Sequence, residues 1–306
     1  MGKVAFVFPG QGSQQVGMGR GAFDTVAGRD VFVEADAALG DAISRLCFEG
    51  PDAELQLTAN AQPAILTTSI ALLRGLDQAC DVVAGHSLGE YSANVAAGTL
   101  RFADAVALVR KRGSYMQEAV PLGRGAMAAV LGADAALVEK ICDETEGVVT
   151  PVNYNCPGQL VIAGDAAAVA LASTALQAAG GKVRALPVSA PFHCALMQPA
   201  EDRLEPDLRQ VSWSAPNVPI YVNVDAAPVV SADAARSALV RQVSRPVRWQ
   251  QAIERMLADG VSLFVEIGPG KVLTTMIKRI AKDVGRVNVE TPGDMDAARS
   301  AIAKHR

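Results

Sequence analysis

Hydrophobic positions along the chain follow two different periods. Short, unbroken apolar runs, KVAFVF at 3–8 and VSLFVEI at 261–267, are typical of strands buried on both faces of a parallel sheet. Longer stretches at 30–47, 61–78 and 102–120 have the composition and spacing of helices. Strands that alternate with helices predict an α/β protein with a parallel sheet.

The pattern changes between 123 and 190. A strand (GAMAAVLG), a helix (DAALVEKICDETEG), two strands (VVTPVNYN and GQLVIAGD), another helix (AAAVALASTALQAAGG) and a last strand (KVRALPVSA) follow one another there. The order βαββαβ is that of a ferredoxin-like unit. Buried-strand patterns resume afterwards, at VPIYVNV. We therefore expect one larger α/β domain, formed by 1–122 and 191–306, that carries a small ferredoxin-like subdomain at 123–190.

Composition and charge narrow the class of protein. The chain has 306 residues, half of them hydrophobic, and its net charge of −4 provides no overall basic field for a nucleic acid. The N-terminal apolar run is too short for a secretory signal, and polar residues in the uncharged stretch 56–73 argue against a membrane span. Five cysteines without CxxC spacing indicate reduced thiols, and three histidines form no metal-binding pattern. We expect a cytoplasmic protein without a nucleic-acid or membrane partner.

The stretch DVVAGHSLGEYSANVAAG at 81–98 contains the first candidate for chemistry. Within it, GHSLG fits the G-x-S-x-G nucleophile elbow, placed between a short apolar run and a segment of helical composition. Gly85 and Gly89 have no Cβ atoms to obstruct the turn, and the following helix directs N–H groups to the place where an oxyanion would form. Ser87 is therefore a candidate nucleophile. The alternative is a glycine-rich turn with an incidental serine.

A nucleophilic serine needs a base, and histidine is the usual one. His193 in VSAPFHCALMQPA follows an apolar strand end and a proline, where α/β proteins present catalytic loops, although a capping or core histidine would also fit. His86 should point to the other face of the turn and support it, and His305 lies in a charged C-terminal segment. No acid stands out as a triad member. Either another group orients the base, or the chain is not a hydrolase.

Two further segments are candidates for binding. FPGQGSQ at 8–14 follows the first strand but lacks the lysine of a P-loop, so Gln11 could offer backbone N–H groups to an oxyanion or lie in a plain turn. Arg112, in LVRKRGSYM, fits a surface charge run. If it is buried instead, its guanidinium fork implies a carboxylate ligand.

Together these segments closely resemble the bacterial malonyl-CoA:acyl carrier protein transacylases and the related acyltransferase domains of polyketide synthases. The matching stretches occur in the family's order and span nearly the whole chain: FPGQGSQ (8–14), NAQPA (60–64), GHSLGEY (85–91), KRGSYMQEAV (111–120), NYNCPGQLVIAG (153–164), PFHCALM (191–197), RQVSRPVRW (241–249) and EIGPGKVL (266–273). The resemblance implies a hydrolase-like domain with a ferredoxin-like insert, and a monomer. It also implies ping-pong transfer of malonyl from malonyl-CoA to the phosphopantetheine thiol of acyl carrier protein, in fatty-acid biosynthesis and without a cofactor or metal.

The resemblance also assigns roles to individual positions. Ser87 would be the nucleophile and His193 its base, oriented by a backbone carbonyl oxygen rather than by an acid. Arg112 would hold the free carboxylate of the malonyl group. Gln11 and Leu88 would form the oxyanion hole with their backbone N–H groups. The remaining substrate-binding positions implied by the family are Gln242, which would lie beside His193, Gln62, Asn155 and Phe192.

Phe192 bears on selectivity, because a phenylalanine directly before the base goes with malonyl over methylmalonyl in the polyketide relatives. It could fill the space that a 2-methyl group needs, or it could simply pack. Docking of an acidic carrier protein would need basic residues, and the candidates, which could equally be ordinary solvated charges, are Lys182, Arg184, Lys271, Lys278 and Arg279. A serine esterase or thioesterase, an acyltransferase that serves a polyketide synthase, and a non-catalytic scaffold that binds carrier protein remain the alternatives.

Overall fold

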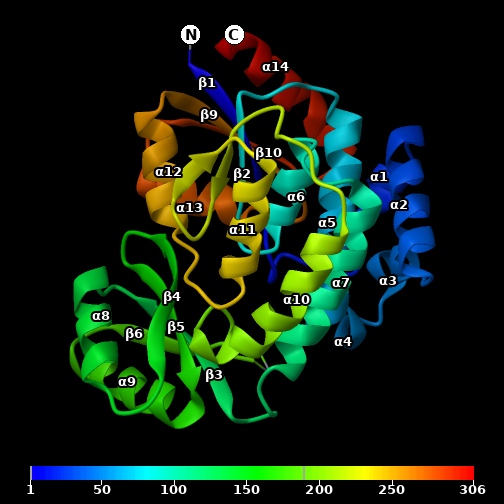
Figure 1. Ribbon diagram of the computed structural model, residues 1–306. Helices are drawn as coiled ribbons and strands as arrows, with labels where there is room; N and C mark the ends of the chain where they lie inside the picture. The colour runs from blue at the N-terminus through cyan, green and yellow to red at the C-terminus, as the bar shows by residue number, and fades with distance from the viewer. Residues whose placement is uncertain (1, 189) are drawn as a thin grey trace.

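The computed structural model describes residues 2–188 and 190–306. A six-stranded sheet forms the centre of the larger part of the molecule, in the order β10-β9-β1-β2-β7-β8 (Figure 1). Neighbouring strands are parallel, except that β7 and β8 are antiparallel. The strands are β1 (Lys3–Phe8), β2 (Val82–Gly85), β7 (Ile220–Val222), β8 (Ala227–Val229), β9 (Val261–Ile267) and β10 (Gly285–Val289).

Helices cover both faces of this sheet, because alternate side chains of each strand point to opposite sides. Phe6 and Phe8 of β1 belong to the main core, whereas Val7 packs in a second core with Ile253 and Leu273. Among the described residues, no helix combines the length and the apolar composition needed to cross a bilayer. The helices are α1 (Arg20–Phe23), α2 (Val26–Leu39), α3 (Ile43–Glu49), α4 (Asp52–Leu55), α5 (Thr58–Leu76), α6 (Gly89–Ala96), α7 (Phe102–Glu118), η1 (Ala195–Met197), α10 (Gln198–Gln210), α11 (Ala232–Gln242), α12 (Trp249–Ala258), α13 (Val272–Ile280), η2 (Pro292–Asp294) and α14 (Met295–His305).

A second, four-stranded sheet lies in the small part of the molecule, drawn in green in Figure 1. Its order is β4-β5-β3-β6 and all its pairs are antiparallel. Val138 and Leu176 from its two helices pack on Val130 and Ile162 of the sheet. The elements are β3 (Gly125–Leu131), α8 (Ala135–Glu144), β4 (Val149–Cys156), β5 (Gln159–Asp165), α9 (Ala166–Ala178) and β6 (Lys182–Ala185). The chain order βαββαβ confirms the predicted fold class, a parallel-sheet domain with a ferredoxin-like insert. The division at 122/123 and 190/191 stays a prediction.

Three local expectations differ from the structure. The helix expected over 30–47 is two helices, because Gly40 ends α2 in the left-handed region with φ 62°. The strand expected over 182–190 ends at Ala185, where Pro187 soon removes a backbone donor, and position 189 lies outside the described residues. Finally, β10 was not predicted, because most of its residues are only half-buried and give a weak apolar signal.

The fold brings the candidate loops to one edge of the large sheet. β1 and β2 pair in parallel with Phe8 opposite Gly85, so the loops that follow them leave the sheet side by side. β7 lies on the other side of β2 and ends just before Asn223. In open α/β sheets, ligands bind outside the carboxyl ends of the strands. The candidate site lies at this edge.

Candidate active site

Ser87 lies in a tight turn between β2 and α6. Its φ of 50° is in the left-handed region, which a residue with a side chain adopts only at a cost. The flanking glycines make the turn possible, since a Cβ on Gly85 would lie 1.9 Å from the carbonyl carbon of Gly89. A Cβ on Gly89 would lie 2.0 Å from the oxygen of Phe8. The strained turn therefore directs the serine hydroxyl away from the backbone, as the elbow pattern predicts.

His193 lies against the serine although 106 positions separate them in the chain. Its Nε2 atom is 2.7 Å from Oγ of Ser87, and its Nδ1 atom is 2.7 Å from the backbone oxygen of Gln242. A carbonyl oxygen only accepts hydrogen bonds, so Nδ1 carries the proton and Nε2 presents a lone pair to the hydroxyl. Burial and the positive charge of Arg112 lower the pKa of His193 to about 3. The imidazole is thus neutral and able to accept a proton.

Arg112 is 1% exposed and reaches into the same cluster from α7. Its Nη1 donates to Oε1 of Gln62 at 2.7 Å, and its Nη2 donates to Oε1 of Gln242 at 2.9 Å and to Oγ of Ser87 at 3.2 Å. Its Nε has no acceptor among the described residues. All three acceptors are neutral, so a buried guanidinium sits beside the candidate nucleophile without an ion-pair partner in the described chain.

Two backbone donors expected in an oxyanion hole lie close to the elbow. The loop after β1 packs on the turn, since a Cβ on Gly10 would lie 2.4 Å from the oxygen of His86. The backbone N–H groups of Gln11 and Leu88 have no acceptor among the residues that the structure describes. The Gln11 side chain turns to Thr58, whose Oγ1 accepts from its Nε2 at 3.2 Å. The oxyanion role of the two N–H groups stays a prediction.

The other predicted residues are divided between the cluster and its surroundings. Gln62 and Gln242 contact Arg112 directly. Asn155 instead has its Oδ1 atom 2.9 Å from Nε2 of His86, so it supports the elbow from beneath, and direct contact with a substrate stays a prediction for it. Phe192 is 8% exposed and packs in the main core directly before the candidate base. Its selectivity role stays a prediction as well.

Sequence reasoning missed two buried polar residues, Asn223 and Glu90. Oδ1 of Asn223 accepts from the backbone N–H of Ser87 at 2.7 Å, and its Nδ2 donates to the oxygen of Gly85 at 2.7 Å, which ties both sides of the turn together. Glu90 is fully buried, and burial raises its pKa to about 7. Each has a recognisable signal, since Glu90 is a lone charge in an apolar helix and Asn223 ends the apolar run VPIYV.

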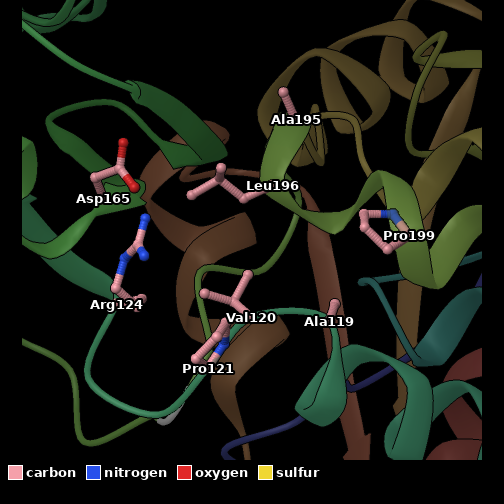
Figure 2. A pocket seen from close by; sticks show the side chains of 8 residues that line it. All are labelled: Ala119, Val120, Pro121, Arg124, Asp165, Ala195, Leu196 and Pro199. Atoms are coloured by element: carbon pink, nitrogen blue, oxygen red, sulfur yellow. The ribbon is translucent and has the colours of Figure 1, made fainter.

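A cavity of about 340 Å³ lies next to the loop that holds His193 (Figure 2). Its lining comes from the segment after α7, from the ends of the small sheet and from η1 and α10, with Leu196 over the cavity and Arg124 and Asp165 pointing toward one another. None of the predicted catalytic side chains lines it. The candidate docking residues are exposed on β6 and around α13, where Arg279 is already bonded to the oxygen of Pro157 at 2.9 Å. Docking by them stays a prediction.

Comparison with known proteins gives consistent matches. The family profile described as "Acyl transferase domain" matches residues 5–299. The malonyl CoA-acyl carrier protein transacylase of Escherichia coli K12 is 50% identical, and the alignment covers 97% of this chain and 99% of that protein.

Solved structures agree with these matches. The malonyl CoA-acyl carrier protein transacylase from Coxiella burnetii has a TM-score of 0.96 at 41% identity, with 98% of each chain covered. A malonyl-transacylase solved in complex with a type II polyketide synthase acyl-carrier protein has a TM-score of 0.94 at 43% identity, and covers 97% of this chain and 98% of that one.

Proposed function

Because the chain belongs to the acyl transferase family, we propose that it moves a malonyl group from malonyl-CoA to the phosphopantetheine thiol of acyl carrier protein, through an ester on Ser87. The reaction serves fatty-acid biosynthesis. The observation that carries the proposal is the buried Arg112, whose Nη2 lies 3.2 Å from Oγ of Ser87 and whose hydrogen-bond acceptors are all neutral. A guanidinium in that position would bind a substrate carboxylate next to the point of attack.

The first half-reaction forms the ester. Nε2 of His193 takes the hydroxyl proton as Oγ of Ser87 attacks the thioester carbonyl. The negative charge that develops on the carbonyl oxygen is stabilised by the backbone N–H groups of Gln11 and Leu88, and each such donor is worth about 3–4 kcal/mol in the transition state. The C–S bond then breaks, and the imidazolium returns its proton to the departing thiolate, so that coenzyme A leaves as a thiol.

The second half-reaction reverses the roles. The phosphopantetheine thiol of the carrier protein gives its proton to Nε2 of His193 and attacks the ester carbonyl. The C–Oγ bond breaks, Ser87 recovers the proton from His193, and the malonyl group leaves as a thioester of the carrier protein. The same base and donors serve both steps, so no metal or resident cofactor is required for the proton transfers.

The malonyl carboxylate also influences the base. The positive charge of Arg112 is one of the causes that lower the pKa of His193, because it opposes the imidazolium that forms during attack. A carboxylate bound to Arg112 neutralises that charge and makes proton transfer to His193 easier. Malonyl-CoA would therefore be favoured over acetyl-CoA both in binding and in reaction. We also propose that the enzyme is a cytoplasmic monomer, which binds its carrier protein as a separate molecule.

The proposal is tested by measuring intact mass after brief mixing with malonyl-CoA, in the wild type and in Ser87→Ala. The expected result is a gain of one malonyl group in the wild type alone, which is lost to added holo-acyl carrier protein. Acetyl-CoA and methylmalonyl-CoA serve as parallel substrates. An adduct lost to water as fast as to carrier protein would indicate a thioesterase instead. A folded protein that forms no adduct would contradict the proposal.

A further inference from the structure

Glu90 is a buried carboxylate that the reaction above does not use. It lies on α6, three positions after Ser87 in the sequence, and its exposure is 0%. Oε2 accepts hydrogen bonds from the backbone N–H of Asn223 at 2.7 Å and from Nε2 of Gln242 at 3.0 Å. Oε1 has no donor among the described residues. A carboxylate with one unsatisfied oxygen is expensive to bury, so its position calls for an explanation.

The side-chain amide of Gln242 connects Glu90 to the candidate substrate site. Its Nε2 donates to Glu90 and, at 3.0 Å, to the backbone oxygen of Ser87, while its Oε1 accepts from Nη2 of Arg112 at 2.9 Å. The amide thus presents its positive end to the carboxylate and its negative end to the guanidinium. One buried anion and one buried cation are held on either side of a single amide, beside the nucleophile.

We propose that Glu90 balances the charge of the site: when a malonyl carboxylate binds to Arg112, the carboxylate of Glu90 takes up a proton from solvent. This inference rests on the proposed function, because it requires a carboxylate to bind at Arg112. Without substrate, and above pH 7 where Glu90 is ionised, the buried charges of Arg112 and Glu90 sum to zero. A bound malonyl carboxylate leaves one surplus negative charge in the cluster that contains the buried Arg112 and Glu90, and protonation of Glu90 removes it.

The surroundings of Glu90 explain why this group, and not a neighbour, takes up the proton when a carboxylate binds. The charged and titratable groups that influence it are Arg112 on α7, Asp225 after β7, Arg241 on α11 and its neighbour Tyr91. Arg241 and Asp225 already form a bidentate pair, at 2.8 and 2.6 Å, so they largely neutralise each other. His193 resists protonation, because burial and Arg112 lower its pKa to about 3. Burial raises the pKa of Glu90 to about 7, so protonation there costs little at neutral pH.

Proton uptake makes malonyl binding depend on pH in a defined direction. Below pH 7 most Glu90 is already protonated, and affinity for malonyl-CoA is insensitive to pH. Above pH 7 a proton must be gained on binding, so the dissociation constant rises with pH, by up to about tenfold per pH unit. Acetyl-CoA has no free carboxylate, and its affinity should show no such dependence.

The experiment is titration calorimetry of malonyl-CoA into Ser87→Ala, which cannot form the ester, in buffers of different ionisation enthalpy. At pH 7.5 a carboxyl with a pKa of about 7 is roughly three-quarters ionised, so we expect uptake of about half to three-quarters of a proton per ligand. Acetyl-CoA should give about zero in the same protein. The double variant Ser87→Ala, Glu90→Gln should also give about zero with malonyl-CoA, and its dissociation constant should not change between pH 7 and 8.5.

Malonyl-CoA that binds with no proton uptake would overturn the role of Glu90 and leave the proposed function intact, as would uptake that persists in the Glu90→Gln variant. If that variant does not fold, the pH dependence of malonyl-CoA binding to Ser87→Ala decides: a dissociation constant that begins to rise near pH 7 supports Glu90, and one that does not change there overturns its role. Failure of the proposed function has a different signature, because the wild type would then form no malonyl ester in the mass measurement.

Discussion

The backbone oxygen of Gln242 accepts a hydrogen bond from Nδ1 of His193 at 2.7 Å, in the position where a serine triad usually has a carboxylate. A peptide carbonyl fixes the tautomer of the ring as an acid would, but it carries no full charge to stabilise an imidazolium. The side chain of the same residue holds Arg112. Gln242 thus joins the orientation of the base to the position of the guanidinium.

This double role predicts an asymmetric effect of Gln242→Ala. The backbone carbonyl remains, so His193 should keep its tautomer. Arg112 loses a buried acceptor, which typically costs about 1–3 kcal/mol, or roughly 5- to 150-fold. We expect most of the loss in the KM for malonyl-CoA, measured by steady-state transfer to carrier protein. The comparison is His193→Ala, which should lower the rate of ester formation by about 10²- to 10⁴-fold. A comparable collapse of that rate in Gln242→Ala would contradict the assignment.

Arg112→Ala should separate malonyl from acetyl transfer. Losing the guanidinium removes the partner of the malonyl carboxylate, and we expect malonyl transfer to fall by about 100-fold or more, with acetyl transfer unchanged or faster because the pKa of His193 is no longer lowered by Arg112. The matched control is Lys111→Ala on the same helix, which removes an exposed ion pair with Asp207. Such pairs contribute little. Equal losses for both substrates in Arg112→Ala would rule out the role.

The two buried titratable groups predict opposite effects of pH on stability. Between pH 6.5 and 3 the unfolded chain binds a proton at His193 that the folded protein does not, so the free energy of unfolding falls as pH falls. Between pH 4.5 and 7 the folded protein holds a proton on Glu90 that the unfolded chain releases, so the free energy of unfolding falls as pH rises. The two effects oppose each other between pH 4.5 and 6.5.

Single variants should separate these effects. In Glu90→Gln the effect of Glu90 is removed, and stability should rise with pH relative to wild type by about 1.4 kcal/mol per pH unit in this interval. In His193→Gln the relative slope should have the opposite sign. Denaturant unfolding at pH 4.5, 5.5 and 6.5 measures both slopes. Parallel curves for all three proteins would contradict the assignment of the two buried groups.

Phe192→Ser should relax the choice between malonyl-CoA and methylmalonyl-CoA. The ring is buried directly before His193, and removing it opens space for a methyl group. Rejection of one extra methyl group is commonly worth about 10- to 200-fold, and we expect most of that preference to disappear. Competition between the two substrates, followed by intact mass, gives the ratio directly. An unchanged ratio in a variant that still forms the malonyl ester would leave Phe192 as a packing residue.

The sequence predicted the parts of the site that have local signatures. Gly85 and Gly89 reveal the turn around Ser87, because the turn itself excludes side chains there. Asn223 stands out only as a polar residue at the end of an apolar run, and that signal does not reveal its contact with Ser87 across 136 positions of the chain. Glu90 was overlooked for a related reason, since its partners Gln242 and Asn223 come from two distant elements.

The fold, like the site, could be predicted from the sequence only where the signal is local. The chain order of the elements in the insert could be predicted from the hydrophobic pattern, because β3, β4 and β5 each bury several apolar residues. By contrast, Gly40 divides a long helical pattern that periodicity alone leaves continuous, and the half-buried β10 gives too little apolar signal to stand out. An element that is completely buried on one face can be predicted from its hydrophobic pattern alone. The formation of a half-buried element depends instead on the tertiary partners that it packs against.

The separation of the catalytic parts along the chain has a consequence for biosynthesis. Ser87 meets His193 across 106 positions and Gln242 across 155, so the contacts that activate the hydroxyl each close a long loop of the chain. A nascent chain that has formed the elbow, but not yet α11, holds an ordinary alcohol. The hydrogen bond that fixes the tautomer of His193 therefore forms only once the segment that carries Gln242 has folded onto the elbow.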